Sequence, residues 1–117
     1  MKITEFGKLL RKLRIEHDEL LKDMANKLGV TASYLSAVEI GKRNIPKKWE
    51  EVIVKAYHLD DTKALELRES IEYSSKVINI KAEELDKEEK NLILMLARKV
   101  SELDEIDKNN LREILFK

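Results

Sequence analysis

Residues 24–38 read MANKLGVTASYLSAV, and this stretch decides the fold. Gly29 is suited to end a helix, because glycine readily adopts the positive φ with which many helices terminate. Thr31 is suited to cap the next helix, since its hydroxyl oxygen can accept a hydrogen bond from a free backbone N–H group. Two helices that cross closely also need a small residue and buried aliphatic residues. The stretch supplies these as Ala25, Val30, Leu35 and Val38. It therefore predicts a helix-turn-helix.

Helical spacing of apolar residues continues on both sides of this stretch. It predicts seven helical segments and an all-α fold class. The first three segments cover residues 4–17, 20–28 and 31–40. The other four begin near residues that favour helix starts, which are Pro46, Asp60 or Thr62, Asp86 and Asp104. Breakers are scarce, with 3 Gly and 1 Pro, as a largely helical chain requires.

The pattern changes around residues 74–76, where helical spacing gives way to β-branched residues. This change predicts a boundary between a five-helix domain, residues 1–75, and a C-terminal two-helix extension, residues 76–117. The segment 77–80 reads VINI and is open to forming a short strand between the two parts.

The composition narrows the class of protein. The 117 residues include no cysteine, which excludes disulfides and thiolate metal sites. The chain begins directly with a charged helical pattern, and the longest apolar run, residues 92–97, is far too short to cross a bilayer. We therefore expect a cytoplasmic protein without membrane contact.

The formal net charge is 0, but the charges are unevenly distributed. Residues 1–60 hold 12 Lys and Arg against 9 Asp and Glu, whereas residues 61–117 hold 11 against 14. The first half is therefore positive by 3 and the second half is negative by 3. A basic first half is compatible with a nucleic-acid partner.

Further residues surround the predicted helix-turn-helix at characteristic spacings: Phe6-Gly7, Leu10, Leu13-Arg14, Met24-Ala25, Leu28-Gly29-Val30, Leu35, Val38-Glu39, Gly41-Lys42 and Pro46. In this pattern the chain resembles the XRE family, the Cro/CI-type repressors of phages and bacteria, over roughly residues 3–60. The resemblance implies a five-helix, lambda-repressor-like DNA-binding domain. It also implies a homodimer that binds a palindromic operator in double-stranded DNA, with the third helix in the major groove.

The resemblance also assigns roles to individual positions. Four residues of the third helix would face base edges, namely Ala32, Ser33, Ser36 and Ala37. Four residues would contact phosphates or lie along the DNA backbone, namely Tyr34, Lys42, Arg43 and Asn44. An ion pair between Arg14 and Glu39 would tie the first helix to the third, a task that suits the guanidinium fork.

Two features depart from the family pattern. Leu20 and Leu21 stand where Ser or Thr and then Gln are usual, so a helix N-cap and a polar phosphate clamp are missing. The lost cap is worth about 1 kcal/mol. We expect Lys22 to replace the clamp as a phosphate contact. The base-facing residues also lack side chains that could make two hydrogen bonds to one base. Contacts with thymine methyl groups, single serine hydrogen bonds and DNA shape would then carry specificity.

The sixth predicted helix carries an apolar stripe, made of Leu92, Ile93, Leu96, Val100 and Leu103. Leu94, Met95 and Ala97 widen the stripe, so the helix needs apolar partners on two sides. The seventh helix is one partner, and a second copy of the chain is the other. This predicts a homodimer through residues 76–117, with segment 77–80 a candidate to pair across the two-fold axis. The alternative is that both sides fold back on the chain's own first domain.

These observations favour a DNA-binding transcriptional regulator, most simply a repressor of a phage or mobile element. The alternative is an antitoxin or regulatory protein whose C-terminal helices bind another protein, such as a toxin or an antirepressor. We expect no enzyme, because there is no Gly-rich phosphate loop and no serine nucleophile with a plausible histidine partner. His17 and His58 are isolated from other ligand residues, so we expect no metal and no cofactor.

Overall fold

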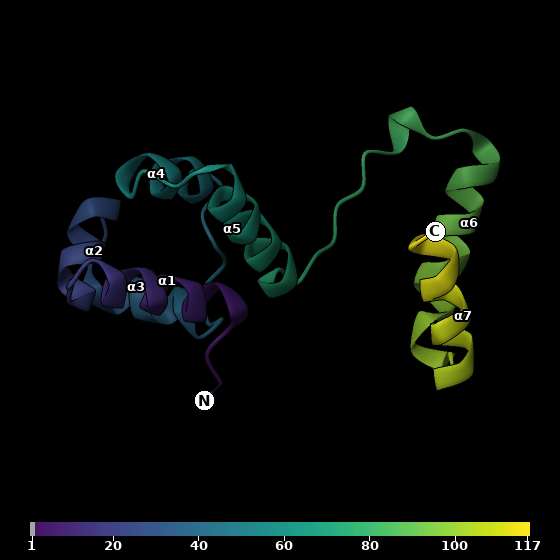
Figure 1. Cartoon of the computed structure of the whole chain (residues 1–117), viewed down its shortest axis with the longest axis horizontal. Helices are drawn as coiled ribbons and strands as arrows, with labels where there is room; N and C mark the ends of the chain where they lie inside the picture. Colours follow the sequence, from purple (N-terminus) through teal and green to yellow (C-terminus); the bar gives the residue numbers. More distant parts are fainter. Residues whose placement is uncertain (1) are drawn as a thin grey trace. The chain divides into compact units, whose positions relative to one another are not determined.

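The computed structural model describes residues 2–117 of the chain (Figure 1). Within these residues all regular secondary structure is helical, which agrees with the predicted all-α class. The α-helices are α1 (Glu5–Glu16), α2 (Leu21–Leu28), α3 (Ala32–Glu39), α4 (Trp49–Ala56), α5 (Asp61–Ser74), α6 (Lys87–Lys99) and α7 (Glu105–Leu115). Two short 3-10 helices, η1 (Ala82–Glu84) and η2 (Val100–Glu102), lie before and after α6. No helix in this part of the chain has both the length and the apolar character that a membrane crossing requires.

Side-chain caps determine where most of the helices begin. Five helices follow a residue whose side-chain oxygen accepts a hydrogen bond from the backbone N–H three residues further on, and these caps are Thr4, Thr31, Asp60, Asp86 and Asp104. Each cap satisfies one of the N–H groups that a helix start leaves without a partner. The sequence indicates the last four as caps, and of its two alternatives for α5 the structure selects Asp60.

Two segments differ from the predictions made from the sequence. The helix α4 begins at Trp49 and not at Pro46, because Pro46 is the first residue of a turn. The carbonyl oxygen of Pro46 accepts a hydrogen bond from the Trp49 N–H at 3.1 Å. Residues 77–80 form neither a strand nor a helix. Their β-branched side chains favour extended backbone, but a strand also needs a neighbouring strand to complete its hydrogen bonds. The short strand between the two parts is therefore not formed within residues 2–117.

The first unit of the chain runs to Ile78 and has one core, to which all of α1–α5 contribute. Its buried apolar residues are Phe6, Leu10, Leu13, Met24, Ala25, Leu35, Val38, Trp49, Ile53, Tyr57 and Leu67. The helix α1 packs against both α3 and α5, while α2 packs against α3 and α4. Figure 1 shows α1 and α3 running close together beside α2. The helix α3 is therefore supported from two sides, by α1 and by α2.

The second unit, Asn79–Lys117, contains η1, α6, η2 and α7. None of the residues 79–117 is fully buried. The apolar residues of this unit that are half-buried are Leu85, Ile93, Leu103 and Leu111. A unit of this size buries too small a fraction of its surface to build a core of its own. Most of its apolar side chains are consequently exposed.

Candidate nucleic-acid interface

A tight turn joins α2 to α3. Gly29 has a φ of +72°, in the left-handed region that glycine adopts without strain. The Val30 N–H donates to the Ala25 carbonyl oxygen at 3.0 Å, which satisfies one of the last free carbonyl groups of α2. Thr31 then caps α3 by accepting a hydrogen bond from the Tyr34 N–H at 3.0 Å. The turn therefore sets the direction in which α3 leaves α2.

The two faces of α3 have different surroundings. The inner face is buried and consists of Leu35, Val38 and Glu39. On the outer face Ser33 is exposed, while Ala32, Ser36 and Ala37 are partly exposed. These four residues line one open hollow on the surface, together with Leu21, Ile40 and Lys42. Ala32 also packs against the edge of the core. The residues expected to face DNA bases therefore share one accessible surface.

The C-terminal end of α3 is held by the start of α1. The backbone N–H and the hydroxyl group of Thr4 both donate to the carbonyl oxygen of Glu39, each at 2.9 Å. Gly7 allows this close approach, because a Cβ atom at position 7 would lie 2.3 Å from the same oxygen. The glycine is therefore needed for space and not for an unusual backbone angle.

A buried ion pair joins the same two helices. The Arg14 guanidinium donates to both carboxylate oxygens of Glu39, from Nη1 at 2.5 Å and from Nη2 at 3.1 Å. Glu39 is 2% exposed and Arg14 is 8% exposed. Arg11 Nε lies 3.8 Å from the same carboxylate, at the edge of ion-pair distance. A buried pair of this kind is tolerated because each charge has its hydrogen-bond partners.

The loop between α3 and α4 holds cations beside the outer face of α3. Lys42, Arg43 and Asn44 are all exposed. The N–H groups of Lys42 and Arg43 both donate to the carbonyl oxygen of Ala37, at 2.9 and 3.2 Å. The Arg43 guanidinium carbon lies 4.9 Å from the ring centroid of Tyr34, a cation–π distance. Tyr34 itself is partly buried against the core. The cations of this loop are therefore fixed to α3 at several points.

The start of α2 is capped in a way that the sequence analysis missed. Leu20 occupies the N-cap position, and its side chain accepts no hydrogen bond. The carboxylate of Asp23 instead accepts a hydrogen bond from the Leu20 N–H at 2.8 Å. The available signal was an acidic residue three positions after the cap, which is one half of a capping box. Lys22 is exposed in the same first turn, next to Leu21 at the edge of the hollow.

A second polar network, also missed by the sequence analysis, ties α2 to α4. The Tyr57 hydroxyl donates to Glu19 Oε1 at 2.6 Å, and Lys27 forms an ion pair with the same carboxylate. Desolvation raises the pKa of Glu19, but the hydrogen bonds from Lys27 and Tyr57 outweigh it and hold this pKa below its ordinary value. Burial, and then the hydrogen bond to Glu19, raises the pKa of Tyr57. These residues are too far apart in sequence for spacing to reveal the contact.

The predicted dimer residues do not all lie on one helix. Leu92, Ile93 and Leu96 are on α6, but α6 ends at Lys99 and Val100 belongs to the 3-10 helix η2. Leu92 is 60% exposed, Leu96 39% and Val100 45%. Ile93 and Leu103 are half-buried within the second unit. The predicted stripe is therefore divided between an exposed set and a set that packs within its own unit.

Comparisons of the chain with protein-family models, with curated proteins and with solved structures find no match. The function of the chain is therefore inferred from its own geometry.

Proposed function

We propose that this chain is a sequence-specific DNA-binding transcriptional regulator, most simply a repressor, with α3 as its recognition helix. The observation that carries the proposal is the asymmetry of α3. Its inner face is buried and held by α1, while its outer face is accessible and shares one open hollow with Lys42, and Lys22 and Arg43 are exposed on the neighbouring segments. The major groove of B-DNA is about 12 Å wide and admits one helix. A helix anchored on one face and free on the other is suited to enter it.

The helix order supports an assignment to the XRE family with a lambda-repressor-like first unit. In that reading α2, the Gly29 turn and α3 form the helix-turn-helix, and α1 with the Arg14–Glu39 pair holds α3 in place. The packing of α1 against α3 and α5, and of α2 against α3, agrees with such a domain.

The small outer face of α3 suggests how the operator is recognised. Ala32 and Ala37 can contact thymine methyl groups, and Ser33 and Ser36 can each make one hydrogen bond to a base edge. Such contacts discriminate less than the roughly 1–3 kcal/mol of a bidentate pair. Sequence-dependent DNA shape and half-site spacing then supply much of the specificity.

Weak contacts by one recognition helix make a dimer necessary. Linking two binding units raises the overall affinity by about 10²–10⁴, because the second contact becomes intramolecular. The second unit offers exposed apolar residues for association, among them Leu92, Leu96 and Val100. We therefore propose a homodimer through this unit on a palindromic operator of double-stranded DNA.

Selection of bound duplexes from a random DNA pool tests this function. We expect an enriched palindrome, and we expect Ser33→Glu to abolish its binding, because a carboxylate on the outer face of α3 would meet base edges and phosphates. Failure to enrich any sequence, or undiminished binding by Ser33→Glu, would remove the proposal.

A matched pair of lysine variants tests the phosphate contacts. Each phosphate contact contributes about 0.9 to the slope of log affinity against log salt concentration. Lys42→Gln should lower this slope by about 1. Lys55→Gln should leave the slope unchanged, since Lys55 on α4 is exposed, pairs with Glu51 and does not line the hollow at α3. Equal effects of the two variants would argue against contact by the α3–α4 loop.

A second candidate function is that of an antitoxin or regulatory partner, whose C-terminal helices bind another protein. The exposure of Ile106, Ile114, Leu115 and Phe116 favours it, because these residues give α7 and its C-terminal end exposed apolar side chains of their own. Light scattering of the full chain distinguishes the two cases. A stable dimer favours the regulator, while a monomer favours a separate protein partner.

A further inference from the structure

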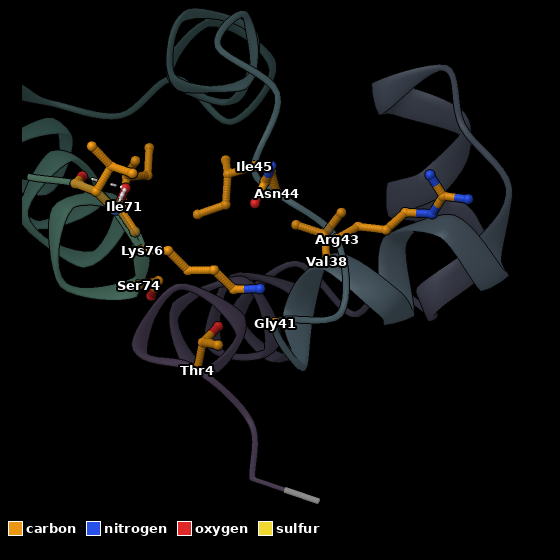
Figure 2. Close-up of a pocket in the computed structure, with 11 residues that line it drawn as sticks. Thr4, Val38, Gly41, Arg43, Asn44, Ile45, Ile71, Ser74 and Lys76 are labelled. Atoms are coloured by element: carbon orange, nitrogen blue, oxygen red, sulfur yellow. Dashed lines mark hydrogen bonds between the residues drawn. The ribbon is translucent and has the colours of Figure 1, made fainter.

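A pocket of about 250 Å³ lies beside the proposed DNA-contacting loop (Figure 2). It is built within the first unit, where the start of α1, the end of α3 with its following loop, and the end of α5 meet. Ligand sites for drug-sized molecules usually measure about 300–1,000 Å³, so this pocket suits a smaller molecule.

Hydrogen bonds between the helices hold the walls of the pocket. The backbone N–H of Phe6 donates to the hydroxyl of Ser74 at 3.0 Å, and this hydroxyl donates to the Ser70 carbonyl oxygen at 2.8 Å. Thr4 is tied to the end of α3 through the Glu39 carbonyl oxygen. Three helices are therefore fixed to one another around the pocket, which favours a site that exists before a ligand arrives.

The lining combines apolar side chains with positive charge. Val38, Ile45 and Ile71 provide the apolar part. Among the described residues that line the pocket none is acidic, and Lys76 extends across it toward the α3–α4 loop (Figure 2). Arg43 also lines the pocket, but its guanidinium turns away to the ring of Tyr34. Lys76 is thus the cation best placed to meet a ligand.

We propose that this pocket binds a small amphipathic carboxylate and that the bound acid weakens DNA binding. The apolar body of the acid would lie against Val38, Ile45 and Ile71, and its carboxylate would meet the Lys76 ammonium group, with the Asn44 amide at the rim. The binding site does not depend on the proposed function, whereas the effect on DNA binding rests on that function.

The expected sign of the effect follows from charge. Arg43 and Asn44 belong both to the pocket lining and to the proposed phosphate-contacting loop. A bound carboxylate neutralises Lys76 and places negative charge beside this loop, so the attraction for DNA phosphates falls. By linkage, DNA must weaken the binding of the acid by the same factor.

Amide NMR titration of the full chain with three probes of equal length tests the pocket. The probes are hexanoate, the neutral hexanamide and the cationic hexylammonium. We expect hexanoate to bind in the millimolar range, as ligands of this size do, and to shift the amides of Ile45, Ile71 and Lys76. Hexanamide should bind about three- to tenfold more weakly, because its amide carries no charge that could pair with the Lys76 ammonium group. Equal binding of all three probes, or shifts away from these residues, would overturn the proposal.

Reversing one charge gives a sharper test. Lys76→Glu should reverse the preference, so that hexylammonium binds more tightly than hexanoate. Lys81→Glu, an equal change at an exposed position beyond the pocket, should keep the preference for hexanoate. If the preference is unchanged in Lys76→Glu, or is lost in both variants alike, Lys76 does not select the ligand and the proposal fails.

The coupling to DNA is measured with the selected operator. Hexanoate should lower the operator affinity of the unaltered chain, and hexanamide at equal occupancy should not. If hexanoate binds in the pocket but no operator is enriched, the binding site is correct and the proposed function is wrong. If the NMR titration shows hexanoate bound but the operator affinity does not fall, the effect on DNA is wrong. If hexanoate does not bind and Lys76→Gln lowers the salt slope, Lys76 is a phosphate contact and the pocket proposal fails.

Discussion

Glu39 connects α3 to α1 through both its backbone and its side chain. Its carbonyl oxygen accepts two hydrogen bonds from Thr4, and its carboxylate accepts two from Arg14. Because the carboxylate is almost fully buried, it depends on these partners for its charge. The orientation of α3 therefore depends on the contacts that Thr4 and Arg14 make with its last residue, Glu39.

Removing one charge of the Arg14–Glu39 ion pair should lower the free energy of unfolding more than removing both charges does. Arg14→Met leaves the buried carboxylate with Arg11 alone, whose Nε lies 3.8 Å away, and we expect a loss of about 3 kcal/mol in the free energy of unfolding. The double variant Arg14→Met, Glu39→Leu removes both charges and should regain much of that loss. Urea unfolding of the two single variants and the double variant measures the coupling. Additive losses would show that the two charges do not interact.

Gly7 and Gly29 should respond differently to alanine. Alanine normally stabilises a helix interior by roughly 0.5–1 kcal/mol over glycine. At position 7 the added Cβ would lie 2.3 Å from the Glu39 carbonyl oxygen, so Gly7→Ala must separate α1 from α3. At position 29 no atom lies within 4 Å of the added Cβ, and the cost is backbone strain alone, roughly 1 kcal/mol. Thermal unfolding should show the larger loss for Gly7→Ala, and the reverse order would contradict the close approach.

The contact of Tyr57 with Glu19 predicts two pH windows. The pKa of Tyr57 is raised on folding, so its contribution is complete below the ordinary tyrosine pKa of about 10 and is lost as the pH rises above it. The pKa of Glu19 is lowered, so its contribution is present above the ordinary value of about 4.3 and is lost as the pH falls through the lower, folded value. Tyr57→Phe should flatten the alkaline dependence of unfolding. An unchanged alkaline slope in this variant would mean that Tyr57 does not couple to folding.

At the scale of one element, α2 shows how a weak helix start is compensated. Leu20→Ser should stabilise the protein by about 1 kcal/mol, because the serine hydroxyl supplies the missing cap and little burial is lost at a side chain that is 63% exposed. Asp23→Ala should destabilise it by roughly 0.5–1 kcal/mol, since the Leu20 N–H loses its partner and the helix start loses a negative charge. Denaturant unfolding measures both changes in the free energy of unfolding. Two changes of the same sign would contradict the prediction.

At the scale of the whole molecule, the second unit should gain its stability from association with the second unit of another copy of the chain. It has no fully buried side chain, and chains below about 40 residues seldom fold without metals, disulfides or oligomerisation. Leu92→Asp and Leu96→Asp should each weaken self-association by about tenfold or more. Asn91→Asp, on the same helix, adds the same charge without removing an apolar side chain and should leave the dimer intact. Light scattering over a concentration series measures this, and a monomeric unaltered chain would contradict the dimer.

Local sequence was sufficient for features that depend on neighbouring residues. Helical spacing and the capping residues Thr31, Asp60, Asp86 and Asp104 predicted the all-α class and most helix starts, because caps and periodicity act within one or two turns. The same local rules were insufficient at Pro46, where a turn replaced the first turn of α4. They were also insufficient at residues 77–80, since β propensity alone does not provide a pairing strand.

Only the tertiary structure decided which distant groups meet. The contact of Tyr57 with Glu19, the approach of Gly7 to Glu39, and the pocket beneath Lys76 each join segments far apart in the chain. No periodicity encodes such contacts, because they depend on how the helices pack. The amino-acid sequence thus determined the helices and where most of them begin, while the packing of α1 and α2 against α3 decided which face of α3 remains open to a partner.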